Sequence, residues 1–401
     1  MKKTFLILFV VIFSGYSTTA QKFDNLALTP PMGWNSWNRF KCDINEKLVR
    51  EIAKAMVETG MKDAGYRYIV IDDCWQVARD EEGNILADPD RFPSGIAALA
   101  DYIHSLGLKF GLYSDAGVKT CQKRPGSRGY EFQDARTYAR WGVDYLKYDW
   151  CDHSTQNAPA SYALMRDALY KAGRPVVFSI CEWGQNQPWL WGKDIGHLWR
   201  ATGDIRSSFI EPLDWGETVV SIIEKVNLIR KYSGPGHWND LDMLQVGNKG
   251  ISVTESRSHF TMWCMLSSPL MAGNDLRNMP EEIKNILINK EVIALNQDSL
   301  GIPALKWVDY GDFEIWLKPL QNGDYALCFL NLDTKTKNFE IELSGNRVYD
   351  GDFNKIHNGI YEIDDSFQIR DLWKHKMIGT TKEKLSIRVP GHDVVLLRLI
   401  K

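Results

Sequence analysis

An apolar, aromatic-rich run at residues 145–151 ends in charged side chains. If this run is a strand, Lys147 and Asp149 lie on one face, and Tyr148 and Trp150 lie on the other. A nearby ammonium group favours the ionised form of a carboxyl group, which is the form that a nucleophile or an electrostatic stabiliser needs. Asp149 is therefore the candidate nucleophile. Taken alone, the run would also fit a solvated aspartate at the end of a buried strand.

Further carboxylates follow other apolar segments of the chain. They are Asp72, Asp73, Glu182, Asp204, Asp240 and Asp242. Clustered carboxylates without histidine suit either a hard-cation site or a glycosidase pair with further carboxylates that bind sugar hydroxyls. Aromatic and cationic side chains in the same segments favour the sugar site, since a magnesium site ordinarily serves phosphates and no phosphate-binding loop is present. These side chains are Trp34, Trp37, Tyr113, Lys147, Trp183, Trp199 and Arg200.

Short apolar segments alternate with helical stretches between about residues 30 and 298. The strand candidates are residues 32–37, 66–73, 108–115, 145–151, 175–182, 197–200, 236–242 and 268–275. Helical periodicity is clearest at 45–60, 95–107 and 217–232. Eight strands separated by helices predict an α/β fold, a closed (β/α)8 TIM barrel with its active face at the carboxyl ends of the strands. A doubly wound open sheet is the alternative, but its usual Gly-rich phosphate turn is absent.

The pattern changes after about residue 300. Apolar and polar side chains alternate at residues 313–317, 325–331, 339–343, 385–389 and 394–399. Asn322-Gly323 between two of these runs is a strong hairpin signal. We therefore expect a small antiparallel β-sandwich. The expected organisation is a signal peptide at 1–20, a catalytic barrel at 21–299 and a C-terminal sandwich at 300–401.

Composition and the N-terminus limit the function classes. The 401-residue chain has a net charge of -3 and no basic block, which argues against nucleic-acid binding and favours small or neutral substrates. Met1-Lys2-Lys3, the apolar stretch at 5–13 and the small residues up to Ala20 resemble a secretory signal. The apolar stretch is too short to cross a bilayer, so we expect an exported, soluble protein, periplasmic or extracellular, without a membrane anchor.

Seven cysteines are present, and export would allow them to form disulfides. Because seven is odd, at least one must stay unpaired. The chain has no Cys-x-x-Cys pair and no His-Glu-x-x-His motif. We therefore expect neither a metal nor a cofactor.

A series of short motifs runs along the chain in a distinctive order. It comprises residues 31–37 (PMGWNSW), 71–75 (IDDCW), 111–115 (GLYSD), 145–151 (YLKYDWC), 181–184 (CEWG), 199–205 (WRATGDI), 238–244 (WNDLDML), 274–277 (NDLR) and 296–298 (NQD). The series resembles the α-galactosidase (melibiase) group, glycoside hydrolase family 27, and covers nearly all of the chain after the signal.

The resemblance implies a retaining double displacement on terminal α-galactosyl groups, with Asp149 as nucleophile and Asp204 as acid/base. Such a pair lies about 5 Å apart, because the nucleophile must reach the anomeric carbon while the acid protonates the leaving oxygen. Asp204 donates a proton first and activates water later, so we expect it to titrate nearer neutrality than Asp149. Neighbouring Lys147 should help to keep the two pKa values apart.

The resemblance also implies a substrate-binding set. Asp72 and Asp73 match residues that bind the hydroxyls of carbons 4 and 6, and a carboxylate at Asp72 would select axial O4. Lys147 matches a residue on the 3 and 4 hydroxyls, while Arg200 and Asp242 match residues on the 2-hydroxyl side. The further expected positions are Trp37, Tyr113, Cys121, Cys151, Glu182, Trp183 and Met243. Among them Glu182, which is bulky and charged, favours galactose over an N-acetylated sugar.

Disulfides Cys42–Cys74 and Cys121–Cys151 match pairs of the family, and the second would brace the loop beside Asp149. The other cysteines, Cys181, Cys264 and Cys328, are expected to be buried thiols.

Some positions depart from the family pattern. Trp150 stands where a smaller or polar residue is usual, Leu241 replaces a proline, and residues 206–209 (RSSF) replace a more acidic stretch. These departures leave the leaving-group side undefined.

The expected activity is that of an α-galactosidase acting on a galactose-containing oligosaccharide or glycoconjugate, with an oligomeric state that the sequence leaves open. The alternatives are a related retaining glycosidase, namely an α-N-acetylgalactosaminidase, a β-L-arabinopyranosidase or an isomaltosyl-releasing enzyme, and a non-catalytic galactose-binding protein. Retention of both Asp149 and Asp204 argues against a pure binder, which would need neither.

Overall fold

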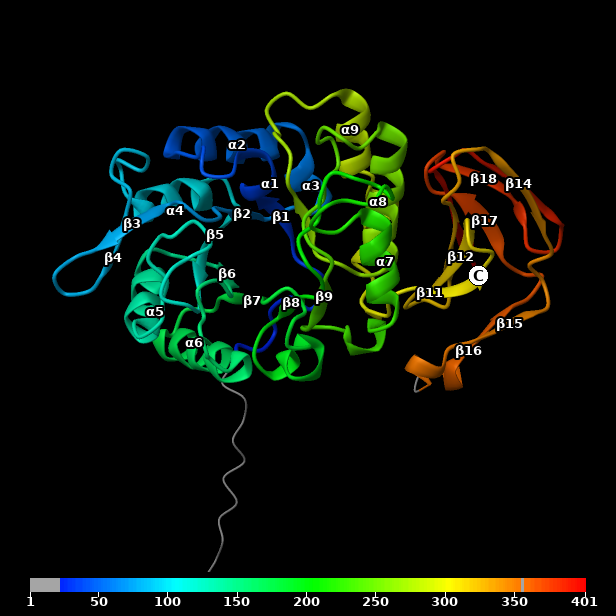
Figure 1. The fold of residues 1–401 in the computed structure, drawn as a ribbon. Helices are drawn as coiled ribbons and strands as arrows, with labels where there is room; N and C mark the ends of the chain where they lie inside the picture. The colour runs from blue at the N-terminus through cyan, green and yellow to red at the C-terminus, as the bar shows by residue number, and fades with distance from the viewer. Residues whose placement is uncertain (1–21, 355–356) are drawn as a thin grey trace, which may run out of the picture.

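The computed structural model describes residues 22–354 and 357–401. The signal peptide expected at residues 1–20 lies outside the described residues. Figure 1 shows two units side by side, a helix-rich N-terminal unit coloured blue to green and a strand-rich C-terminal unit coloured yellow to red.

Eight parallel strands form the sheet of the N-terminal unit, in the order β10-β1-β2-β5-β6-β7-β8-β9. They are β1 (Met32–Asn35), β2 (Tyr68–Val70), β5 (Lys109–Asp115), β6 (Tyr145–Asp149), β7 (Val177–Cys181), β8 (Leu198–Arg200), β9 (Trp238–Asp240) and β10 (Leu270–Ala272). The two edges meet where Leu244, just after β9, forms a parallel bridge with Ala272 of β10. Each expected strand segment contains one of these strands, so the predicted barrel is confirmed.

Helices accompany this sheet, and all but the first, a short helix at the mouth of the barrel, cover its outside. They are α1 (Trp37–Phe40), α2 (Glu46–Glu58), α3 (Met61–Ala64), α4 (Ile96–Ser105), α5 (Glu131–Arg140), α6 (Ala158–Ala172), α7 (Val219–Asn227), α8 (Val253–Met265), α9 (Glu281–Leu287) and α10 (Lys290–Asn296). The helix α2 begins where the Asn45 side chain accepts a hydrogen bond from the backbone N–H of Leu48. No helix within the described ranges is long and apolar enough to cross a membrane.

The two faces of β6 meet different surroundings. On the outer face, Tyr148 packs edge-on against Tyr162 of α6, with 5.6 Å between ring centres, and Trp150 packs against the same ring at the same distance. On the opposite face, Lys147 and Asp149 point into the mouth of the barrel. The alternation predicted from the sequence is therefore confirmed, and helix packing fixes which face is internal.

A hairpin that the sequence pattern did not indicate follows β2. Its strands, β3 (Gln76–Arg79) and β4 (Ile85–Ala87), pair antiparallel and project from the barrel in Figure 1. Arg79 ties the hairpin to α5, since its guanidinium donates to both carboxylate oxygens of Asp134 at 2.7 Å. Strands of three and four residues whose exposed positions are apolar, such as Val77 and Leu86, carry too little alternation to be recognised.

The C-terminal unit is an antiparallel sandwich, as predicted. Its larger sheet has the order β11-β12-β13-β20-β17-β18, and the pairs β14-β19 and β15-β16 complete the fold. The strands are β11 (Leu305–Asp309), β12 (Phe313–Pro319), β13 (Tyr325–Asn331), β14 (Lys337–Ile341), β15 (Asn346–Tyr349), β16 (Ile360–Ile363), β17 (Gln368–Asp371), β18 (Lys376–Thr380), β19 (Leu385–Val389) and β20 (Val394–Ile400). Gly323 takes a φ of 87° in the turn between β12 and β13.

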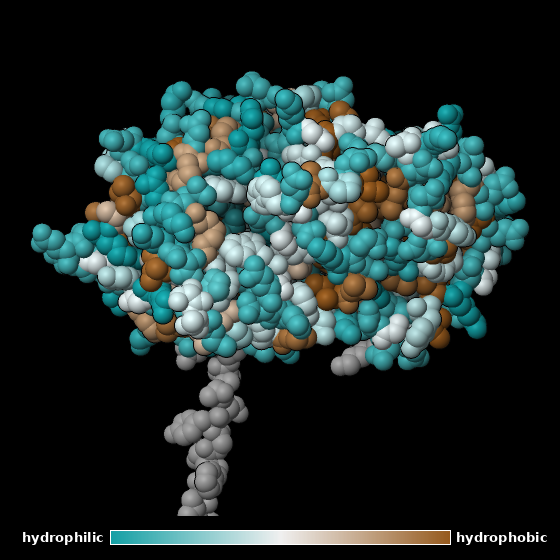
Figure 2. Space-filling view, viewed as in Figure 1, coloured by the Kyte–Doolittle hydropathy of each residue, from teal (hydrophilic) through white to brown (hydrophobic). Residues whose placement is uncertain are grey.

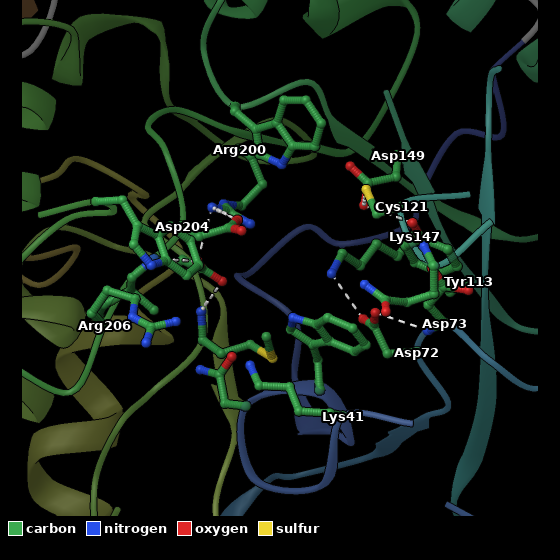
Figure 3. A pocket seen from close by; sticks show the side chains of 18 residues that line it. Lys41, Asp72, Asp73, Tyr113, Cys121, Lys147, Asp149, Arg200, Asp204 and Arg206 are labelled. Atoms are coloured by element: carbon green, nitrogen blue, oxygen red, sulfur yellow. Dashed lines mark hydrogen bonds and ion pairs between the residues drawn. The ribbon is translucent and has the colours of Figure 1, made fainter. Parts of the chain in front are cut away.

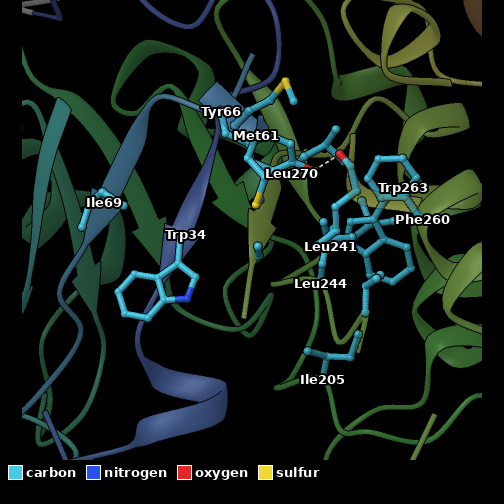
Figure 4. Close-up of a cluster of buried hydrophobic side chains, with 14 of the residues drawn as sticks. Trp34, Met61, Tyr66, Ile69, Ile205, Leu241, Leu244, Phe260, Trp263 and Leu270 are labelled. Carbon is cyan, nitrogen blue, oxygen red and sulfur yellow. Dashed lines mark hydrogen bonds between the residues drawn. The ribbon is translucent and has the colours of Figure 1, made fainter. Parts of the chain in front are cut away.

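The two units share a continuous hydrophobic core. Trp316 of β12 and Leu396 of β20 belong to the same buried cluster as Phe260 and Trp263 of α8. Figure 4 shows the barrel part of this cluster, with Phe260 and Trp263 beside Leu241. On the face drawn in Figure 2, apolar side chains show mainly where the two units meet, and the rest is largely hydrophilic. The sandwich therefore supports the barrel from the side of α8.

Candidate active site

A cavity of about 320 Å³ opens at the carboxyl ends of the barrel strands (Figure 3). Its lining includes Trp37, Asn38, Lys41, Asp72, Asp73, Tyr113, Cys121, Gln122, Lys147, Asp149, Trp183, Arg200, Asp204, Ile205, Arg206, Trp215, Asp242 and Met243. Successive strands supply these residues at their carboxyl ends, which is the active face expected of a parallel barrel. Segments that are distant in the sequence therefore meet around one hollow of monosaccharide size.

Asp149 ends β6 and is buried in the wall of the cavity. Its Oδ2 atom accepts a hydrogen bond from the Tyr113 hydroxyl at 2.8 Å, and Oδ1 accepts one from the backbone N–H of Trp150 at 3.0 Å. Burial raises the pKa of Asp149 to about 6; the charge of Lys147 opposes this rise and the charge of Asp204 adds to it. Burial also raises the pKa of Tyr113 well above its usual range, so its hydroxyl stays protonated and donates to Asp149.

Asp204 lies in the loop after β8 and keeps 44% of its side chain exposed. The Arg200 guanidinium donates to its Oδ1 atom at 3.0 Å. Partial burial favours the neutral acid, but the charges of Arg200 and Lys147 outweigh it and hold the pKa of Asp204 below its ordinary value. We expected Asp204 to titrate nearer neutrality than Asp149. That prediction is wrong for the free site, because the guanidinium pairs with Asp204 while Asp149 is buried.

Lys147 interacts directly with Asp72 rather than with Asp149. Its Nζ atom donates to Asp72 Oδ2 at 2.8 Å, and the Asn35 side-chain amide donates to the same oxygen at 2.8 Å. The pairing links β6 to the end of β2, across β5. Lys147 therefore favours the ionised form of Asp149 through its charge, as expected, while its direct contact is with a carboxylate of another strand segment.

Asp73 is presented to the cavity by two backbone donors. Its Oδ1 atom accepts from the Cys74 N–H at 2.7 Å, and Oδ2 accepts from the Gln122 N–H at 2.9 Å. Burial nevertheless raises the pKa of Asp73 above its ordinary value. Asp72 and Asp73 thus stand side by side as acceptors at one wall of the cavity.

Asp242 connects Arg200 with the loop that carries Asp204. Its Oδ2 atom lies 2.8 Å from the Arg200 guanidinium and accepts a hydrogen bond from the Ile205 N–H at 2.8 Å. The Asp242 backbone is left-handed, with a φ of 73°, a conformation that costs a non-glycine residue about 1 kcal/mol. This strained turn aims the carboxylate at Arg200 and Ile205 and so fixes the position of Asp204.

Two disulfides stand where they were expected. Cys42 is bonded to Cys74 and Cys121 to Cys151, and the Cys121 sulfur lies 3.6 Å from Asp149 Oδ2. Asp115, Cys121, Asp149 and Cys151 are close enough together to resemble a metal site, but disulfide sulfurs are not thiolates and cannot act as ligands of that kind. The remaining cysteines are buried thiols, as expected: Cys181, Cys264 and Cys328.

The cavity brings together the expected catalytic and substrate-binding positions except Cys151 and Glu182, which do not line it. Glu182 is fully buried, and its Oε2 atom accepts from the backbone N–H of Asn186 at 2.6 Å and from the side-chain amide at 2.8 Å. Burial raises the pKa of Glu182 to about 7. The direct contact with a sugar 2-substituent that we expected from Glu182 is therefore not supported by its position.

The cavity also contains residues that the sequence did not single out. Asn38, Gln122 and Ile205 each follow a predicted site residue directly, so proximity in the motif could have indicated them. Lys41 and Trp215 come from loops without a motif signal. Arg206 was noted only as a departure from the family pattern, so its place in the lining is new information.

Two family models match the chain. The model "Alpha galactosidase A" covers residues 29–298, and the model "Alpha galactosidase C-terminal beta sandwich domain" covers residues 310–399. The chain belongs to the α-galactosidase family, glycoside hydrolase family 27. Membership accounts for both structural units and for the carboxylate-rich cavity.

Similar α-galactosidases extend over nearly the whole chain. "Alpha-galactosidase A" of Cellvibrio japonicus is 54% identical over 385 residues, which cover 95% of this chain and 94% of that protein. The structure of α-galactosidase I from Mortierella vinacea matches with a TM-score of 0.87 at 40% identity, covering 94% of this chain and 98% of that one. A Saccharomyces cerevisiae α-galactosidase with raffinose matches with a TM-score of 0.86 at 32% identity, covering 95% and 99%. The chain is accordingly a glycoside hydrolase with α-galactosidase activity.

Proposed function

We propose that the chain removes terminal α-galactosyl groups by a retaining double displacement, with Asp149 as nucleophile and Asp204 as acid/base. The observation that supports this assignment is that both carboxylates line one cavity yet differ in environment. Asp149 is buried against Tyr113, whereas Asp204 is partly exposed against Arg200. In this proposal the buried Asp149 contacts the sugar, and the partly exposed Asp204 meets the leaving group and water.

In the first displacement, a carboxylate oxygen of Asp149 bonds to the anomeric carbon as the bond to the leaving oxygen breaks. Asp204 gives its proton to that oxygen, so the leaving group departs neutral. In the second displacement, Asp204 takes a proton from water, the water oxygen bonds to the anomeric carbon, and the carboxylate of Asp149 is released. Two inversions return the α configuration.

The remaining polar side chains bind and orient the sugar in this proposal. Asp72 and Asp73 accept from hydroxyls at one wall, and Lys147 donates between Asp72 and the sugar. Arg200 and Asp242 form the opposite wall, beside Asp204. Axial O4 is what distinguishes galactose from glucose, and an epimer would leave a buried acceptor such as Asp72 without its partner.

Substitution of Asp149 tests the proposed nucleophile. The Asp149→Ala variant should lose about a thousandfold or more in kcat with nitrophenyl α-galactoside, because no group remains to form the glycosyl ester. Asp101→Ala, which removes an exposed aspartate of α4, serves as the matched control and should hydrolyse normally. Azide added to Asp149→Ala should restore turnover and give the β-galactosyl azide. Full activity of Asp149→Ala would reject the assignment.

Two further measurements separate the roles of the pair. Asp204→Ala should lose more activity on a sugar leaving group than on nitrophenolate, which leaves without a proton. Nuclear magnetic resonance should show α-galactose as the first product of the unmodified protein, and initial β-galactose would refute retention. A panel that includes the N-acetylgalactosaminide and the β-L-arabinopyranoside tests the sugar preference.

Export is part of the same proposal. Residues 1–20 have the charge and hydropathy pattern of a signal peptide, and the two disulfides suit an oxidising compartment. Mass spectrometry of the protein recovered outside the cytoplasm should give an N-terminus near residue 21. An intact N-terminus on protein confined to the cytoplasm would contradict export.

A further inference from the structure

Two cations line the cavity apart from the proposed sugar-binding residues. Lys41, the residue after α1, has its Nζ atom 4.9 Å from the centre of the Trp37 ring. Arg206 follows Asp204 by two residues, and its guanidinium lies 4.2 Å from the centre of the Trp215 ring. Figure 3 shows Arg206 beside Asp204 and Lys41 below the cavity, both across from Asp149.

Neither cation has an anionic partner. Lys147 and Arg200, the other cations of the lining, are each paired with carboxylates at 3.0 Å or less. Within the described part of the chain, no carboxylate oxygen lies within 4.0 Å of the charged nitrogens of Lys41 or Arg206. Burial lowers the pKa of Lys41, and the charge of Arg206 lowers it further, while the charges of Asp72 and Asp204, which make no ion pair with Lys41, act in the opposite direction. The two cations therefore repel each other, and an anion between them would relieve that repulsion.

Arg206 is held in place by the loop that carries the proposed acid/base. The backbone N–H of Arg206 donates to the backbone carbonyl of Glu217 at 2.8 Å. The backbone N–H of Glu217 in turn donates to the backbone carbonyl of Asp204 at 2.8 Å. Gly216 has a φ of 81°, and a Cβ atom there would come within 2.6 Å of Arg206 Cγ. Glycine at this position thus leaves room for the stem of Arg206, while Trp215 covers its charged end. Such packing indicates a built position rather than a loose surface side chain.

The placement identifies the part of the substrate that these residues face. The group that protonates the leaving oxygen must lie on the leaving-group side of the scissile bond. Because Asp204 is the proposed acid/base, the location of that side depends on the proposed function. Arg206 lies on the loop of Asp204, and among charged groups Arg206 has the largest effect on Lys41. The two cations therefore face the leaving group together.

We propose that Lys41 and Arg206 form a leaving-group site that selects α-galactosides whose leaving group carries a carboxylate or a sulfate. Guanidinium and ammonium groups suit these anions through charge-assisted hydrogen bonds. Trp215, which is 60% exposed, adds a flat face beside Arg206 against which the leaving saccharide can pack. The selected substrates are thus acidic galactosides rather than neutral oligosaccharides alone.

Matched substrates test this site directly. Galactosyl gluconate and galactosyl glucitol are the oxidised and the reduced forms of melibiose. The first carries a carboxylate where the second carries a hydroxymethyl group. We expect kcat/KM to be about tenfold higher for the gluconate at low salt, since two partly exposed ion pairs form, and we expect the ratio to fall at high salt. The double variant Lys41→Gln/Arg206→Gln should bring the ratio to about one. Arg39→Gln removes an exposed charge from α1, outside the lining, and should leave the ratio unchanged.

The outcomes separate the two proposals. Hydrolysis of galactosyl glucitol by the unmodified protein tests the proposed function, whereas the ratio of the two substrates tests the leaving-group site. Equal rates for both substrates at low salt would overturn the anionic site and leave Trp215 as a stacking surface for neutral sugars. If the double variant does not fold, the salt dependence of the ratio in the unmodified protein still decides, and a ratio independent of salt overturns the site. Galactoside sulfates in the same assay distinguish sulfate from carboxylate as the preferred anion.

Discussion

Replacing Tyr113 by phenylalanine tests whether one hydrogen bond sets the acidity of the proposed nucleophile. The Tyr113 hydroxyl donates to Asp149 Oδ2 at 2.8 Å. Phenylalanine keeps the buried ring and removes the donor. Because that hydrogen bond favours the ionised carboxylate, its loss raises the pKa of Asp149 from about 6.

The size of the shift follows from the strength of the bond. A hydrogen bond to a charged group contributes about 1.5–3 kcal/mol, and about 1.4 kcal/mol corresponds to one pKa unit. Burial, Lys147 and Asp204 each affect the pKa of Asp149 more than Tyr113 does. We therefore take the lower end of the range, a rise of about one unit.

The shift has a characteristic effect on rate. The reactive form has Asp149 ionised and Asp204 protonated, and it is a minority form because Asp204 is the stronger acid in the free site. Below about pH 6, raising the pKa of Asp149 by about one unit makes this form about tenfold rarer. Above about pH 8, both carboxylates are ionised in either protein, and the factor disappears. The kcat/KM of Tyr113→Phe relative to the unmodified protein should thus rise about tenfold between about pH 5 and about pH 8.

The assay is kcat/KM for nitrophenyl α-galactoside across this pH range. If Tyr113→Phe also weakens sugar binding, that loss is independent of pH. It lowers the ratio of the two kcat/KM values equally at every pH and does not change how the ratio varies with pH. Tyr148→Phe is the matched control, because the Tyr148 hydroxyl is buried without a hydrogen-bond partner on the opposite face of β6. Its ratio should stay flat. A flat ratio for Tyr113→Phe would show that the hydroxyl does not tune Asp149.

Two further predictions concern stability. Arg79→Ala leaves the buried Asp134 carboxylate without its cation, so it should lower the free energy of unfolding in urea by about 3 kcal/mol. The control Arg347→Ala breaks an exposed ion pair and should change this free energy by less than about 0.5 kcal/mol. Burial lowers the pKa of Lys318 from 10.5 to about 7. Between these two pH values, Lys318 is protonated in the unfolded chain but neutral in the folded protein, so the stability of the folded protein should rise with pH. Lys318→Met should lack this increment, about 2 kcal/mol between about pH 7 and about pH 9, and an equal rise in both proteins would contradict it.

The sequence predicts the barrel and most of the cavity because both depend on short-range patterns. Strand alternation placed Lys147 and Asp149 on one face and Trp150 on the other, since a strand has a fixed period of two. The carboxyl ends of parallel strands meet at one face, so the polar residues that end each apolar segment had to converge. The sequence alone therefore predicts that Asp72 and Asp149 lie in one site.

The partners within the cavity could not be predicted in the same way. Lys147 lies two residues from Asp149 in the sequence, yet it pairs with Asp72, which is 75 residues away. Which carboxylate an ammonium reaches depends on strand order and on the side-chain direction across the barrel, and neither is encoded in alternation. Arg206 and Trp215 come together because a loop folds back on itself, and loop conformation carries no periodic signal.

The pKa order of the two carboxylates follows from their neighbours and must change along the proposed reaction. In the free cavity, Arg200 and partial exposure keep Asp204 ionised. A sugar that fills the cavity excludes water from Asp204 and so raises its pKa, which favours the proton needed for the first displacement. The repulsion that Asp204 exerts on Asp149 acts equally in the other direction. Once Asp149 is an ester its charge is gone, the pKa of Asp204 falls again, and the ionised base required by the second displacement is restored.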